Sequence, residues 1–120
     1  MRLNKYFKRE EFKCKCGCGY ATVDAELLRV LTDVRKKFDS PITINSGCRC
    51  ISHNHDVGGR PNSKHIKGLA ADIVVKDVQP SVVYKYLIDN YPYSLGLGNY
   101  ETFTHVDSRS EKARWGIIAS

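Results

Sequence analysis

The sequence predicts a single α+β domain, with helices packed on a small, mostly antiparallel sheet. Two segments, 24–38 and 80–91, repeat apolar residues with the period of an amphipathic helix. Apolar or alternating runs typical of short strands lie at 42–44, 69–75, 95–97 and 103–107. The chain has 120 residues, the length of one domain, so we expect one domain over residues 1–120.

The elements follow in order from local signals. A polar segment up to Tyr20, Cys-rich over residues 10–20, is expected to be irregular. Asp24 is a favoured residue type for a helix N-cap, and Ser40-Pro41 ends the helix that it starts. The apolar face of that helix consists of Leu27, Leu28, Leu31, Val34 and Phe38.

The segment from Ser46 to Lys67 is long, polar and rich in Gly, Asn, Ser, Arg and His. A loop of this length is uncommon in a compact domain unless it is functional. After the strand at 69–75, Pro80 suits the first turn of the second helix. The chain closes on Trp115-Gly116-Ile117-Ile118.

Composition excludes several classes of protein. Hydrophobic residues are 42% and charged residues 27%, which excludes a disordered tail, a coiled coil and a collagen-like chain. No apolar run approaches the roughly 18–20 residues of a membrane helix. The first twelve residues are basic but lack the apolar core of a secretory signal peptide, so we expect a cytoplasmic protein.

Lys and Arg total 19 and Asp and Glu total 13, which gives a net charge of +6. This balance favours an anionic partner such as nucleic acid, a membrane surface or a cell-wall polymer. The alternative is that the charge only keeps the protein soluble.

Five cysteines form two runs, Cys14, Cys16 and Cys18, then Cys48 and Cys50. An odd count without a signal peptide argues against a purely disulfide-bonded framework. Their C-x-C spacing differs from the C-x₂₋₄-C of common zinc sites. Four thiols could still hold one structural zinc if the runs meet; a disulfide between the runs and free thiols are the alternatives.

The chemistry-bearing residues lie on two predicted strands and the loop before them. Asp72 stands within an apolar run, where a carboxylate is costly unless it is paired or coordinated. His65 ends the polar loop, and Gly68 lets the chain turn between them. His105 and Asp107 share one face of a strand because side chains alternate. Two His and one carboxylate form a common set of ligands for catalytic zinc. The alternative is a purely structural role, in which the histidine is hydrogen-bonded within the core and the Asp pairs with an Arg.

Five segments together resemble the zinc D-Ala-D-Ala peptidases of the M15 family. S-K-H-I-K-G-L-A-A-D, from Ser63 to Asp72, matches the family's S-x-H-x-x-G-x-A-x-D signature. N-S-G-C-R ending at Arg49 resembles its S-G-x-R segment, and T-H-V-D ending at Asp107 resembles its last ligand strand. R-W at 114–115 and the start F-K-C-K-C-G-C-G complete the resemblance, which covers roughly residues 10–117.

The resemblance implies a hedgehog/DD-peptidase-like fold and zinc held by His65, Asp72 and His105. It implies hydrolysis of peptide bonds in peptidoglycan stem peptides or cross-links, as in the small single-domain phage and bacterial cell-wall hydrolases. Arg49 would hold a substrate carboxylate or the developing oxyanion. We expect a monomer with no nucleic-acid partner, cytoplasmic until released to the wall.

The sequence departs from the family at the proton acceptor. Many members carry Glu or Asp three residues before the last His, where this chain has Thr102. Asp107 is our expected base because it shares a strand face with His105; Glu101 is the alternative, and Asp107 would then orient a ligand. Ser63 is expected to bind substrate or hydrogen-bond near the metal, with shaping of the loop as the alternative.

Two competing functions remain. A catalytically inactive, zinc-containing wall-binding module would explain Thr102. A metal-dependent nuclease is suggested by the contiguous His53-Asn54-His55 and the basic charge. Because the nuclease motif is normally spread over tens of residues, His53 and His55 are better interpreted as lining a substrate groove or covering the loop.

Overall fold

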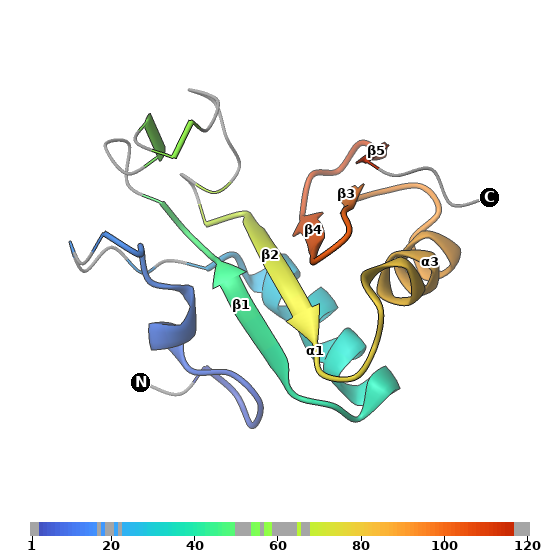
Figure 1. Cartoon of the computed structure of the whole chain (residues 1–120), viewed down its shortest axis with the longest axis horizontal. Coiled ribbons are helices and arrows are strands. Elements are labelled where there is room, and N and C mark those ends of the chain that lie inside the picture. The colour runs from blue at the N-terminus through green and yellow to red at the C-terminus, as the bar shows by residue number, and fades with distance from the viewer. Residues whose placement is uncertain are drawn as a thin grey trace.

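The computed structural model describes residues 3–16, 18, 21, 23–49, 54–55, 57–58, 65 and 68–116. Two helices pack against a five-stranded sheet with the strand order β1-β2-β4-β3-β5 (Figure 1). All strand pairs are antiparallel except β3 with β5, which confirms the predicted α+β class. The elements are η1 (Arg9–Phe12), α1 (Ala25–Phe38), β1 (Ile42–Ser46), β2 (Ala70–Val75), α3 (Pro80–Asn90), β3 (Gly96–Asn99), β4 (Thr104–Asp107) and β5 (Ala113–Gly116).

Both predicted helices are present, with the capping that the sequence indicates. The Asp24 carboxylate accepts the backbone N–H of Leu27 at 3.1 Å, which satisfies one of the unpaired donors of the first turn of α1. Asp39 ends α1 in the left-handed region at φ 49°. Pro80 occupies the first turn of α3, where its missing N–H costs nothing.

The two faces of the sheet have different roles. The apolar face packs against both helices, and the fully buried α1 residues Leu27, Val30, Leu31 and Val34 contribute to that core. Ala71, Ile73 and Val75 of β2 and Val106 of β4 join the same core. The alternate residues of these strands, including Asp72 and His105, therefore point to the opposite face, away from the helices. This face carries the polar residues singled out in the sequence.

Two elements were not predicted. The 3₁₀ helix η1 lies in the segment expected to be irregular, and its Phe12 is buried. β5 pairs in parallel with β3, with Leu97 opposite Arg114 and Gly98 opposite Trp115. Its sequence, A-R-W-G, is only four residues long and has no β-branched residue, so its local pattern marks it only weakly as a strand. Among the described residues, no helix is long and apolar enough to cross a membrane.

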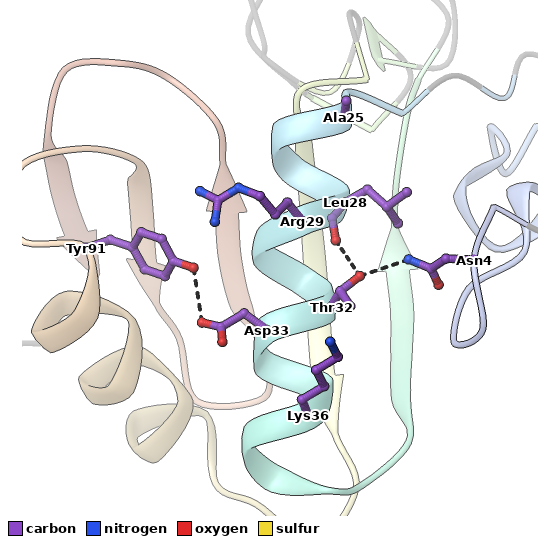
Figure 2. Close-up of a pocket in the computed structure, with 8 residues that line it drawn as sticks. All are labelled: Asn4, Ala25, Leu28, Arg29, Thr32, Asp33, Lys36 and Tyr91. Atoms are coloured by element: carbon purple, nitrogen blue, oxygen red, sulfur yellow. Dashed lines mark hydrogen bonds between the residues drawn. The ribbon is translucent and has the colours of Figure 1, made fainter.

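The outer side of α1 carries a hollow of about 530 Å³. Figure 2 shows its lining, in which Tyr91 reaches across to Asp33 of α1. Tyr86 and Tyr91 both donate their hydroxyls to Asp33 Oδ2, at 2.9 and 3.0 Å. This carboxylate therefore joins α3 to α1. None of the predicted metal ligands lines this hollow.

Replacing Tyr86 by phenylalanine should lower the free energy of unfolding by about 0.5–1.5 kcal/mol, because one hydrogen bond to Asp33 is lost. Urea unfolding at neutral pH measures this change. Tyr93→Phe is the matched control, since Tyr93 is 86% exposed and its variant should unfold like the native chain. Equal stability of the two variants would contradict the assigned role of the Asp33 contact.

The same bond makes stability sensitive to alkaline pH. Burial, together with the hydrogen bond to Asp33, raises the pKa of Tyr86 to about 12 from an ordinary value of 10.0. The folded state thus holds this proton more tightly than the unfolded chain does. The contribution is full below pH 10 and is lost as the pH rises toward 12. Tyr86→Phe should lose less stability than the native chain across this window.

Candidate metal centre

One row of residues crosses all five strands of the sheet. The register places Ser46 of β1 opposite Asp72 of β2, and Asp72 opposite His105 of β4. His105 in turn lies opposite Gly98 of β3, which lies opposite Trp115 of β5. Because opposite residues share a face, the functional side chains of this row meet on the polar side of the sheet.

The three predicted metal ligands come together at this row. His65, Asp72 and His105 each offer a ligand atom, and these atoms lie within 4.8 Å of one another. His105 Nδ1 is 2.9 Å and His65 Nε2 is 3.4 Å from Asp72 Oδ1. His65 reaches the site from the loop before β2, where Gly68 turns the chain at φ 69° as the sequence predicts.

Backbone contacts hold His65 in one orientation. Its Nδ1 lies 2.6 Å from the carbonyl oxygen of Gly47, so the Nδ1–H donates to that oxygen. The backbone carbonyl oxygen of His65 accepts the backbone N–H of Arg49 at 2.8 Å. His65 is 3% exposed, and this tautomer leaves Nε2 directed at Asp72 with a lone pair for a metal.

The charges of the site suit a divalent cation. Burial raises the pKa of Asp72, but the adjacent imidazoles of His105 and His65 outweigh it, and the pKa lies well below its ordinary value. Asp72 is therefore ionised. Burial lowers the pKa of His105, whereas its bonds to Asp107 and Asp72 raise it above the ordinary value. Two imidazoles and one half-buried carboxylate form a donor set that zinc prefers.

Asp107 lies behind His105 and is fully buried. His105 Nε2 is 2.9 Å from Asp107 Oδ2, so the two ring nitrogens of His105 face two different carboxylates. Arg109 donates from Nε to Oδ1 at 2.7 Å and from Nη2 to Oδ2 at 2.8 Å. The backbone N–H of Gly96 donates to Oδ1 at 3.1 Å. Asp107 is 0% exposed, so this carboxylate is enclosed by donors.

Arg49 lies at the edge of the site, beside Asp72. Its Nη2 is 3.7 Å from Asp72 Oδ2. Nε donates to Ser46 Oγ at 3.2 Å and Nη1 donates to Asn54 Oδ1 at 3.1 Å. These bonds fix the guanidinium next to the predicted metal ligand Asp72, within reach of a group bound there.

Aromatic rings form a wall on the other side of His105. The Trp115 ring centroid is 5.0 Å from that of His105, and Trp115 Nε1 donates to the hydroxyl of Tyr100 at 2.8 Å. The guanidinium of Arg109 lies over the Trp115 ring at 5.2 Å. A Cβ at Gly98 would lie 2.5 Å from Trp115 Nε1, so only glycine leaves room for this wall.

A family model described as Peptidase M15 matches residues 5–107. This chain belongs to the peptidase M15 family. One relative is the "Zinc D-Ala-D-Ala carboxypeptidase" of Streptomyces albus G, which is 51% identical over 35 residues. That match covers 29% of the present chain and 14% of the relative's length. The family resemblance expected from the sequence motifs is thus confirmed.

The remaining predicted M15 residues divide into two groups. Ser63 and His53, expected at the substrate groove, lie outside the described residues. His55 is exposed, and Glu101 is exposed in the turn between β3 and β4. Neither residue belongs to the described cluster of possible metal ligands.

Sequence reasoning missed the residues that enclose Asp107 and His105. Arg109 was not singled out, although the D-x-R spacing at 107–109 joins opposite charges two residues apart. The glycines at 96 and 98 alternate within a strand, a sign that something packs closely against that face. A Cβ at Gly96 would lie 2.3 Å from Asp107 Oδ2. Trp115 was noticed only as part of the closing R-W motif.

Replacing Arg49 by alanine should lower kcat/KM by about 10²–10³-fold, as expected for loss of one donor to a developing oxyanion. Unchanged kcat with a raised KM would assign Arg49 to substrate anchoring alone. Arg29→Ala, on the exposed face of α1 and paired with Glu26, is the control with native kinetics. Steady-state assays of both variants check this; native kinetics for Arg49→Ala would contradict it.

Proposed function

We propose that this M15 protein is a zinc-dependent peptidase that hydrolyses peptide bonds in peptidoglycan stem peptides or cross-links. The convergence of His65, Asp72 and His105 on one side of the sheet carries the proposal. Zinc in such a site activates water and polarises the scissile carbonyl. The positive charge of +6 suits a substrate embedded in anionic wall polymers.

The substrate class follows from the family and from Arg49. Stem peptides end in carboxylates, and a guanidinium binds a carboxylate through two parallel hydrogen bonds. Ser46 and Asn54 hold Arg49 beside the metal ligands, so a substrate carboxylate or oxyanion bound there would lie next to the reacting bond. Ser63 remains a proposed substrate contact.

We expected Asp107 to accept the water proton, and its geometry favours another role. The carboxylate has no exposed surface and accepts from Arg109, Gly96 and His105. In this position it holds the Nε2–H of His105 and leaves Nδ1 directed at Asp72. We therefore assign Asp107 as a positioning residue and give the proton-accepting role to Glu101, the exposed carboxylate that precedes His105.

The second candidate function is an inactive wall-binding module that keeps the metal site. The enclosure of Asp107 favours it, because this carboxylate, one of two that lie 2.9 Å from His105, has no access to a substrate. In this case the chain would bind zinc and sacculi but would release no peptide fragments from the sacculi. A cytoplasmic location until release to the wall, as in phage endolysins, fits both candidates.

Digestion of purified sacculi and defined muropeptides, followed by mass spectrometry, separates the two candidates. A peptidase should yield two products whose summed mass exceeds that of the substrate by one water, and the cleaved bond distinguishes carboxypeptidase from endopeptidase action. Asp72→Asn and chelator-treated protein are the controls that should yield no products. Zinc-loaded protein that binds sacculi yet leaves every muropeptide intact would support the inactive module.

A further inference from the structure

Three cysteine thiols converge in the segment that follows η1, within the N-terminal region of the fold. The ligand atoms of Cys14, Cys16 and Cys18 lie within 4.8 Å of one another. The sulfurs of Cys14 and Cys16 are 3.4 Å apart. A turn at residues 15–16 bends the chain, so alternate side chains of the C-x-C-x-C run meet at one point.

We propose that Cys14, Cys16 and Cys18 bind a second zinc ion, separate from the proposed catalytic one. Zinc–sulfur bonds of about 2.3 Å at tetrahedral angles place sulfurs about 3.8 Å apart. The cluster therefore needs shifts of about an ångström or less to hold the ion. A fourth position is left for water or another donor. The C-x-C spacing is shorter than usual, and the turn compensates for it.

The surroundings of the cluster suit thiolate ligands. Lys13 and Lys15 alternate with the cysteines in the chain and are both exposed. The positive charges of these two lysines offset the net negative charge of three thiolates around one Zn²⁺. Cys14 is fully buried, whereas Cys16 and Cys18 are exposed, so the site has an anchored side and an open side.

Cys48 has a different environment from the cluster. It is 2% exposed, and its thiol donates to the carbonyl oxygen of Phe12 at 3.1 Å. Its backbone N–H donates to the same oxygen at 3.0 Å. Cys50 lies outside the described residues. Cys48 therefore serves as the matched control for the three clustered cysteines.

The bound ion would brace the segment that supports His65. Phe12 precedes the cluster and packs against Gly47, where a Cβ would lie 2.7 Å from Phe12 Cα. Gly47 offers the carbonyl that accepts from His65 Nδ1. A metal at the cysteines thus fixes the chain on which the orientation of His65 depends, and its role is structural.

Elemental analysis of the full chain, purified with zinc and a reductant, tests the second site. The native chain and Cys48→Ser should each contain two zinc ions. Cys16→Ser and Cys18→Ser alter exposed residues and should fold, and each should contain one. Asp72→Asn should also contain one, so loss of either site is recognised independently of the other.

Cobalt substitution identifies which site is lost. The thiolate-to-cobalt charge-transfer absorption should persist in Asp72→Asn and disappear in Cys16→Ser. One zinc per native chain with five titratable thiols would overturn the proposal. So would two zinc ions in Cys16→Ser and Cys18→Ser, or a disulfide within the cluster that persists in the presence of reductant.

Discussion

Replacing Asp72 by asparagine is expected to remove one zinc ion per chain and to reduce peptide hydrolysis to the level of metal-free protein. The amide has nearly the same shape as the carboxylate but carries no charge, so the cation loses its anionic ligand. The nitrogens of His105 and His65 that face this position, at 2.9 and 3.4 Å, also lose their charged neighbour. Elemental analysis and muropeptide digestion measure the two effects.

The fold of the Asp72→Asn variant should survive. The side chain lies on the polar face of β2, whereas Ala71 and Ile73 on either side supply the core packing. Asp33→Asn is a control of the same chemistry at a carboxylate on α1, and it should keep native zinc content and turnover. Full hydrolysis by zinc-depleted Asp72→Asn would refute the metal centre.

Replacing Asp107 by asparagine should weaken zinc binding by about 10–100-fold, the usual cost of losing a group that orients a histidine ligand. His105 Nε2 and Arg109 Nη2 both face Oδ2 of the carboxylate, whereas Arg109 Nε and the Gly96 N–H face Oδ1. An asparagine side chain has one carbonyl oxygen and one NH₂, so on one of these two sides its NH₂ would face other donors. Competition with a chelator of known affinity measures the change. The stability of the metal-free variant should also fall, because Arg109 loses its partner.

A general base at Asp107 would give the opposite pattern. Zinc affinity would then be unchanged, and turnover of the fully zinc-loaded variant would fall by about 10²–10⁴-fold. Glu101→Gln separates the assignments further, since it should lower turnover by a similar factor with native zinc affinity. Native turnover for Glu101→Gln would remove Glu101 from the reaction.

Local signals were sufficient for the helices and for most strands. Asp24 and Pro80 mark helix starts by their own chemistry, and the apolar run at 69–75 predicts β2 to within one residue. The strand order β1-β2-β4-β3-β5 depends on pairing between distant segments, and so does β5. The residues A-R-W-G of β5 do not by themselves indicate that this segment pairs with β3.

The cluster of His65, Asp72 and His105 could be predicted because the chemistry of its members is unusual for their positions, as for a carboxylate within an apolar strand. The role of Asp107 could not be predicted in the same way. Alternation places Asp107 on the face of His105, as expected, but its exposure depends on Arg109 and on the missing side chain at Gly96. Those neighbours come from β3 and from the loop after β4, so only the assembled sheet shows that the carboxylate is enclosed.

The most direct test of the zinc peptidase is a titration of metal-free native chain with zinc while muropeptide hydrolysis is followed by mass spectrometry. Hydrolysis should appear as the site of His65, Asp72 and His105 fills, and the Asp72→Asn variant should show none at any zinc concentration. Cys16→Ser, measured alongside, should reach substantial hydrolysis at its single remaining site. Hydrolysis that is complete before zinc is added, or equal in native and Asp72→Asn chains, would contradict the central claim.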